Sequence, residues 1–235
     1  MNSAYASTAS IDGRYYEVAT PHSLAEQVMI RARDRMYSDF IRICSPKPED
    51  TILDVGVSDV ITDAANMLER RYPDPERITA AGLGTAGEFR AAFPRVAYRQ
   101  IVANEPLPFA DNSFDIATSN AVLEHVGSAA NQRRFVNELM RVARRVFITV
   151  PNRFFPVEHH TGIPLLHWRD TGFRLACRFF GKDDWCRPEN LILMSRRRLR
   201  AACPPDLRVV IGKSGIALGP CSSSLYLYWN GERAN

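Results

Sequence analysis

The stretch that decides the fold is Leu107–Val126, which reads LPFADNSFDIATSNAVLEHV. Asp111–Asn112 supplies turn chemistry, and the apolar run Phe114–Thr118 that follows it is typical of a buried strand. The run ends at the small polar side chains of Ser119–Asn120. Because other strand and helix patterns flank this run, it predicts one unit of a parallel α/β sheet.

The same alternation continues on both sides of this stretch. Helical patterns separate further apolar runs, which predict strands at residues 51–55, 77–81, 96–102 and 146–150. A helical pattern also precedes the first strand at residues 23–44, and two late runs at 207–211 and 223–229 predict closing strands. The chain is therefore predicted to form an α/β domain on a mainly parallel sheet.

The composition excludes several classes of protein. A chain of 235 residues with 46% hydrophobic and 24% charged residues suits one globular domain, or one domain with a modest lid. The net charge of +4 is mild and is not gathered into a long basic stripe, so no nucleic-acid partner is predicted. No window approaches the roughly 18 apolar residues of a membrane span, so no membrane partner is predicted either.

The cysteines indicate the redox environment. There are five of them, scattered along the chain, and none forms a C-x-x-C pair. This pattern argues against a disulfide framework and a structural zinc site, and it favours a reducing compartment. We therefore expect a cytoplasmic protein.

The first candidate for ligand binding follows the first strand. In open parallel sheets, ligands bind beyond the carboxyl ends of the strands. Gly56 lies at this position and lets a ligand approach the backbone, while Asp54 can hydrogen-bond an ammonium group or organise the loop. Taken alone, this short segment fits a plain turn equally well.

Leu107–Val126 resembles class I S-adenosylmethionine-dependent methyltransferases almost residue for residue, with an L-P-F-x-D-x-S-F-D run, a strand, a small polar residue and V-L-E-H. Asp54–Gly56 upstream and Glu138–Val142 before the fifth strand extend the resemblance over about residues 50–168. It implies a Rossmann-like fold, in which a seven-stranded, mostly parallel sheet has helices on both faces and an antiparallel last strand. It also implies S-adenosyl-L-methionine as cofactor, S-adenosyl-L-homocysteine as product and a small-molecule acceptor.

The resemblance assigns cofactor roles by position. The loop under the methionine part of the cofactor would contain Asp54, Gly56, Val57 and Ser58. Gly82 and Leu83 would lie along the ribose, and Asn104 would meet the adenine edge. Ser119 and Asn120 would face the methyl donor and the acceptor.

Two features depart from the family's pattern. The family loop commonly carries further glycines after the first, and this chain lacks them. The family also has an acid at the end of the second strand that clasps the ribose hydroxyls, where this chain reads Gly82–Gly84. Another group, such as Thr85, a water molecule or the backbone, would have to hold the ribose.

The segment Pro151–His160 follows the fifth strand, where this family places groups that bind the acceptor. It joins aromatic rings with ionisable groups, which suits a flat, nitrogen-rich or phenolic acceptor, and a loop that buries its rings against the sheet is the alternative. The candidate substrate-binding residues are Asn120, Phe154, Phe155, His159, Tyr15 and Trp185.

The histidines raise the question of a base or a metal. A base is needed only if the acceptor loses a proton during attack, and His159 is then the first candidate and His160 the second. His125 is expected to be a packing or capping histidine. The neighbouring histidines lack carboxylate or cysteine partners at ligand spacing, so no metal is predicted.

A narrower resemblance concerns the acceptor. Ile11–Tyr16, Pro21–His22 and Phe154–His160 are similar to segments of N-methyltransferases that act on azapteridines of the toxoflavin kind. This resemblance implies methylation of a nitrogen, or an oxygen, of a planar heteroaromatic metabolite in secondary metabolism.

The sequence also predicts how the chain is divided. We expect residues 1–47 to form an N-terminal helical lid and residues 48–235 the methyltransferase core, with an aromatic-rich helical insertion at about 152–203. Two other functions stay open. The missing glycines and the missing ribose acid motivate a partner subunit that only resembles a methyltransferase. A nicotinamide-binding Rossmann protein is the other, although it requires G-x-G-x-x-G and Gly56 stands alone.

Overall fold

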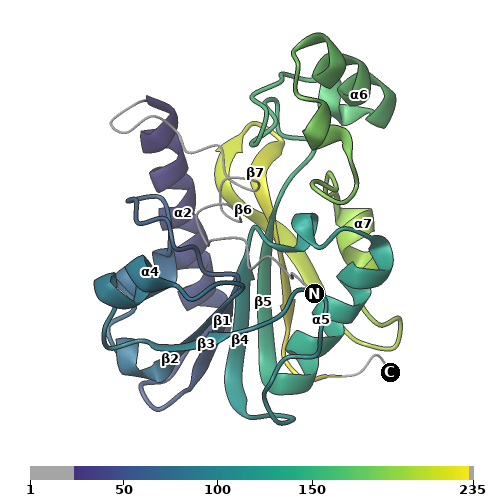
Figure 1. The fold of residues 1–235 in the computed structure, drawn as a ribbon. Helices are drawn as coiled ribbons and strands as arrows, with labels where there is room; N and C mark the ends of the chain where they lie inside the picture. The colour runs from purple at the N-terminus through teal and green to yellow at the C-terminus, as the bar shows by residue number, and fades with distance from the viewer. Residues whose placement is uncertain (1–23, 233–235) are drawn as a thin grey trace, which may run out of the picture.

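One sheet organises the computed structural model, which describes residues 24–232, with side chains from residue 26 onwards. Its strands are β1 Ile52–Val55, β2 Ile78–Gly82, β3 Ala97–Gln100, β4 Phe114–Asn120, β5 Ala143–Pro151, β6 Val210–Leu218 and β7 Cys221–Trp229. The strand order is β3-β2-β1-β4-β5-β7-β6, and β7 runs antiparallel to both of its neighbours (Figure 1). The predicted Rossmann-like sheet with an antiparallel last strand is confirmed.

Helices cover both faces of this sheet (Figure 1). One hydrophobic cluster contains residues of α2 Leu24–Cys44, α3 Met67–Arg71 and α4 Gly87–Ala92. The cluster on the other face contains residues of α5 Ala129–Val142 and α7 Arg196–Ala201. The remaining helix is α6 Asp170–Phe179, and the short 3-10 helices are η1 Pro75–Arg77, η2 Leu123–His125, η3 Leu166–Trp168 and η4 Asp183–Cys186.

The double cover explains the continuous apolar runs in the sequence. Consecutive residues of β1, Ile52 and Leu53, belong to opposite clusters, and both are fully buried. Strand side chains alternate between the two faces, so a strand that is covered on both sides needs apolar residues at every position.

The stretch that predicted the fold is fastened to α5 by one arginine. The Arg141 guanidinium donates to the carbonyl oxygens of Leu107 and Phe109 at 3.0 and 2.9 Å and to the carboxylate of Asp111 at 2.8 Å. The Glu138 carboxylate accepts from the same guanidinium and from the Leu107 amide. These bonds hold the turn before β4 against the helix that leads into β5.

Two predicted elements have different bounds in the structure. The strand expected at 207–211 is β6 Val210–Leu218; as an edge strand paired only with β7, it carries polar residues that hide its length in the sequence. The helical pattern between the strands predicted at 51–55 and 77–81 corresponds to α3, which begins only at Met67. It begins late because the Asn66 side chain is bonded to both the amide and the carbonyl of Ser58, which fixes the preceding loop.

The helix α2 packs along the sheet on the face that β5, β6 and β7 share. Phe40 is 2% exposed and its ring meets that of Phe147 edge-on, with centroids 5.7 Å apart. Near it, Ser214 Oγ donates to the Asp39 carboxylate at 2.7 Å. Helix α2 is therefore part of the core. The division of the chain that makes residues 1–47 a lid stays a prediction.

Residues 152–203 rise from the carboxyl end of β5 and carry η3, α6, η4 and α7 (Figure 1). Part of this segment has a hydrophobic cluster of its own, made of Ile163, Phe173, Ala176, Cys177, Leu191 and Leu193. Within residues 24–232, no helix has the length and apolar character needed to cross a membrane.

Candidate active site

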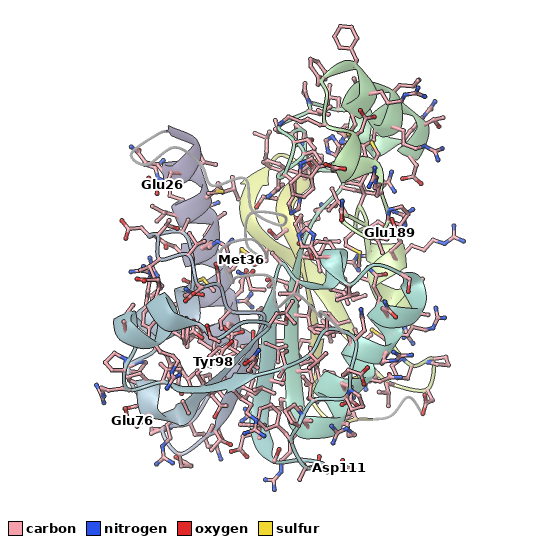
Figure 2. All side chains as sticks on the ribbon, viewed as in Figure 1. Glu26, Met36, Glu76, Tyr98, Asp111 and Glu189 are labelled. Atoms are coloured by element: carbon pink, nitrogen blue, oxygen red, sulfur yellow. The ribbon has the colours of Figure 1, made fainter. Side chains whose placement is uncertain are left out.

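A cavity of about 540 Å³ opens beyond the carboxyl ends of β1, β2 and β3, and we call it the main cavity. Small-molecule sites in proteins occupy about 300–1,000 Å³, so a nucleoside cofactor fits this volume. Its walls include Gly56, Gly82, Asn104, Val122, Asn131 and Glu189. Figure 2 labels two lining residues, Tyr98 from β3 and Glu189 from the segment before α7.

Five predicted cofactor residues line this main cavity: Gly56, Val57, Gly82, Leu83 and Asn104. They come from the loops after three different strands, as the resemblance implied. Asn104 holds φ at +62°, and its carbonyl oxygen accepts a hydrogen bond of 3.0 Å from Arg134. The loop after β3 is thereby fixed to α5 at the rim of the cavity.

Gly56 is required where it stands. Its φ is +100°, a conformation that side-chain-bearing residues rarely adopt. A Cβ built on Gly56 would lie 2.2 Å from Val122 Cγ2, so the loop after β1 and the turn after β4 touch here without room for a methyl group. The Val122 side chain thus occupies the place of a Cβ on Gly56, and the approach of a ligand to this backbone, which the sequence suggested, stays a prediction.

A second hollow of about 40 Å³ lies on the other side of the same loop, and we call it the side hollow. Gly56 and Val57 line both spaces. The remaining loop residues of the prediction, Asp54 and Ser58, line the side hollow with Asn120 and Arg33. These four polar side chains thus meet at the side hollow, and Arg33 is a lining residue that the sequence did not reveal.

Two carboxyl groups interact beside the side hollow. Burial raises the pKa of Asp54 to about 7, with smaller lowering effects from Glu69 and Arg33. Burial and the neighbouring Asp54 charge raise the pKa of Glu69 well above its usual range. The pair therefore retains a proton near neutral pH.

Ser119 does not line either space. Its side chain is fully buried, and its hydroxyl donates to the Val55 carbonyl oxygen at 2.8 Å. The bond ties the end of β4 to the end of β1. Ser119 thus supports the loop at Gly56 rather than presenting a group to a ligand.

The end of β2 carries no acid, as the sequence showed, but four acids from other segments line the main cavity: Asp59, Glu105, Glu138 and Glu189. Asp59 lines the main cavity, and its carboxylate accepts a hydrogen bond of 2.8 Å from the Phe89 amide. The exposed Glu105 lines the main cavity beside Asn104. The sequence signal for Glu105 was its position in the loop that follows the third strand. Asp59 and Glu105 are candidates for holding the ribose.

The residues predicted to bind the acceptor lie outside the main cavity. Phe154 is half exposed and packs edge-on against Trp168, while the Phe155 and His159 rings meet with centroids 5.7 Å apart. Trp185 lines a separate cavity of about 630 Å³ between α5 and the insertion. Asn120 lines the side hollow and accepts from the Thr149 hydroxyl. Tyr15 lies outside the described residues.

His125, expected to be a packing histidine, lines the main cavity. Its Nε2 lies 3.1 Å from His160 Nε2, and its Nδ1 lies 2.6 Å from the Asn190 carbonyl oxygen. Burial, followed by the effect of His160, lowers the pKa of His125 to about 3. The structure also places the carboxylates of Glu124 and Glu158 beside these histidines, which the sequence spacing did not show.

The comparisons with known proteins agree with this geometry. Residues 65–146, from the loop before α3 into β5, match the family described as methyltransferase domain. No curated protein sequence matches the chain.

Among solved structures, the N-methyltransferase NodS from Bradyrhizobium japonicum, in complex with S-adenosyl-L-homocysteine, is 12% identical with a TM-score of 0.55, covering 90% of each chain. A Thermotoga maritima protein assigned provisionally as a histamine N-methyltransferase is 13% identical with a TM-score of 0.51, over 88% of this chain and 94% of the other. A Rhodobacter sphaeroides protein assigned provisionally to the Zn-dependent alcohol dehydrogenases is 11% identical with a TM-score of 0.56, over 92% and 100%. Since the names differ at such low identity, these likenesses show the fold alone.

Proposed function

We propose that this chain is a class I S-adenosylmethionine-dependent methyltransferase and that it transfers the methyl group to a nitrogen or oxygen of a small, planar heteroaromatic metabolite. The observation that carries the proposal is the pair of spaces divided by Gly56 and Val57. The larger space has the volume of a nucleoside site, and the smaller one is lined in part by the polar side chains of Asp54, Ser58 and Arg33.

The residues of the site fit the cofactor. Gly56 lines both spaces and has no side chain, and Val122 fills the place that a Cβ would take. Asp54, Ser58 and Arg33 would hold the charged amino-acid end, and Gly82, Leu83 and Asn104 the nucleoside. S-Adenosylmethionine supplies a methyl group on a sulfonium, already activated for transfer.

The protein's own contribution is alignment. Holding the acceptor atom in line with the methyl group, with water excluded, is worth on the order of 7 kcal/mol or more at best. The residues that line the main cavity include Tyr98, Leu107, Val126 and Phe135. Apolar and aromatic walls of this kind favour a flat acceptor over a strongly hydrated one.

The acceptor side is proposed to include the loop after β5. Phe154 and Phe155 are the aromatic residues of this loop. The ring centroid of Trp185 lies 6.4 Å from that of His125, which lines the main cavity. The base role of His159 stays a prediction. A methyl transfer to a neutral ring nitrogen that carries a lone pair needs no base during attack.

A turnover assay tests the proposal. The full chain is incubated with S-adenosylmethionine and a panel of planar nitrogen and phenolic heteroaromatics, matched against aliphatic amines and alcohols. We expect release of S-adenosylhomocysteine and a mass gain of one methylene on members of the heteroaromatic set. Transfer only to aliphatic acceptors would overturn the substrate class, and cofactor binding with no transfer to any panel member would favour a partner-subunit function.

The cysteines support the compartment proposed for this activity. All five are free, and Cys44, Cys177 and Cys203 are buried. Buried free thiols suit a reducing environment, so we propose that the enzyme acts in the cytoplasm.

A further inference from the structure

A cluster of metal-ligating side chains lies where the insertion meets the turn after β4. Ligand atoms of Glu124, His125 and His160 all lie within 4.8 Å of one another. We propose that these three residues bind a divalent transition-metal ion, with Zn²⁺ the best match. The proposal goes beyond methyl transfer, which does not require a metal.

The orientation of the two imidazoles supports this site. His125 Nδ1 lies 2.6 Å from the Asn190 carbonyl oxygen, and His160 Nδ1 lies 2.9 Å from Glu158 Oε1. Both partners are acceptors, so each Nδ1 carries a proton and each neutral ring directs the Nε2 lone pair at the other ring. The two Nε2 atoms are only 3.1 Å apart.

That separation suits two ligands of one ion. Zinc binds imidazole nitrogen at about 2.0–2.1 Å, so two nitrogens on a tetrahedral ion lie roughly 3.3 Å apart. Two lone pairs that face each other at such a distance repel, and a cation shared between them removes the repulsion. A shared ion therefore accounts for the separation of the rings.

Glu124 supplies an independent observation. Its side chain is 1% exposed, and neither carboxylate oxygen has a hydrogen-bond partner among residues 24–232. A buried carboxylate without a partner is costly. Glu124 Oε1 lies 3.9 Å from His125 Nε2, so an ion beside that nitrogen is within reach of this carboxylate after a small adjustment.

The surrounding residues fix the ligands in place. Glu158, which orients His160, is buried and accepts hydrogen bonds from the Thr161 amide and hydroxyl and from the His160 amide. A carboxylate behind a ligating histidine is the usual arrangement around protein-bound zinc. With His125 held by Asn190, both ligating rings have such a partner.

The placement indicates what the ion does. Glu124 and His125 belong to η2 after β4, whereas His160 and its partner Glu158 belong to the insertion. An ion shared by both segments clamps the insertion against the core next to the main cavity, which His125 lines. Three protein ligands also leave one coordination position for water or a ligand.

A proton offers the alternative account of the same geometry. If His160 carried protons on both nitrogens, its Nε2 would donate to His125 Nε2. That arrangement leaves the Glu124 oxygens without a partner, so it explains less. Metal titration separates the two accounts.

The test uses the full chain stripped of metal with a chelator and titrated with Zn²⁺ or Co²⁺. We expect one ion per chain and, for Co²⁺, the visible absorption of a low-coordinate site. Glu124→Gln and His160→Ala should weaken binding at least tenfold, and Glu158→Gln by about 10–100-fold as an orienting partner. His159→Ala is the matched control, because this neighbouring histidine lies outside the cluster, and its binding should equal that of the parent chain.

Thermal unfolding gives a second readout, which shows whether a variant that fails to bind the metal is still folded. In chelator, Glu124→Gln should be at least as stable as the parent chain, because it removes a buried charge. Added Zn²⁺ should raise the Tm of the parent chain and leave that of Glu124→Gln unchanged. Absence of stoichiometric binding to the folded parent chain, or binding by Glu124→Gln and His160→Ala as tight as that of the parent chain, would overturn the proposal.

Discussion

Gly56 carries the strictest requirement at the residue scale. A methyl group at this position would collide with Val122. Alanine would also have to hold φ at +100°, which is unfavourable for a residue with a side chain. We expect Gly56→Ala to reduce the affinity for S-adenosylhomocysteine at least tenfold and to lower the free energy of unfolding by about 1–3 kcal/mol. Calorimetry and urea unfolding measure the two effects.

A second glycine provides the control for this substitution. Gly87 lies in α4, and a Cβ there has no neighbour within 4 Å. Gly87→Ala should leave cofactor affinity unchanged and stabilise the chain by up to about 1 kcal/mol. Equal behaviour of the two alanine variants would contradict the role given to Gly56.

Ser119 tests the distinction between a ligand group and a supporting one. Its buried hydroxyl bonds the Val55 carbonyl oxygen, which Ser119→Ala would leave with one partner fewer. We expect this variant to lose about 1–3 kcal/mol of stability while its affinity for S-adenosylhomocysteine stays within a few fold. A large loss of affinity at unchanged stability would return Ser119 to the binding surface.

The carboxyl pair beside the side hollow predicts a pH dependence. Raised pKa values mean that the folded chain binds more protons than the unfolded chain, so stability falls as pH rises from about 4 through 7. Without cofactor, Glu69→Gln should therefore unfold at a higher Tm than the parent chain at pH 8 and at a similar Tm at pH 5. Parallel Tm curves for the two chains would contradict the coupling.

At the scale of elements, α2 is predicted to be part of the core. Phe40 is buried against Phe147, so Phe40→Ala should cost about 3–5 kcal/mol in unfolding free energy. Val28→Ala on the same helix is the control, because Val28 is 48% exposed and its truncation should change stability by no more than about 0.5 kcal/mol. Similar small effects of both substitutions would mean that α2 is only loosely attached.

The elements that the sequence predicted well are those with both faces covered. The inner strands β1, β4 and β5 require apolar residues on both sides, which leaves a readable run. The edge strand β6 has no such requirement, because it pairs only with β7 and its exposed positions accept polar residues such as Lys213. The start of α3 depends on hydrogen bonds between the Asn66 side chain and the backbone of Ser58 in the preceding loop, which the helical pattern does not encode.

At the scale of the whole molecule, the candidate site could be predicted only where it is built from strand ends. Gly56 follows β1, Gly82 ends β2 and Asn104 lies in the loop after β3, and parallel strands bring their carboxyl ends to one edge. The contact of His125 with His160 could not be foreseen, because 35 residues separate them and the path of the insertion decides whether they meet. The positions of Phe154 and Phe155 depend on the same insertion, and both rings lie outside the main cavity.

The central claim is that the cavity at the strand ends, with Gly56 at its base, holds a sulfonium nucleoside. Calorimetric titration of the full chain with S-adenosylhomocysteine, alongside an identical titration with NADH, tests it most directly. We expect each chain to bind one molecule of S-adenosylhomocysteine and no NADH. No heat with S-adenosylhomocysteine, or tighter binding of NADH, would contradict it.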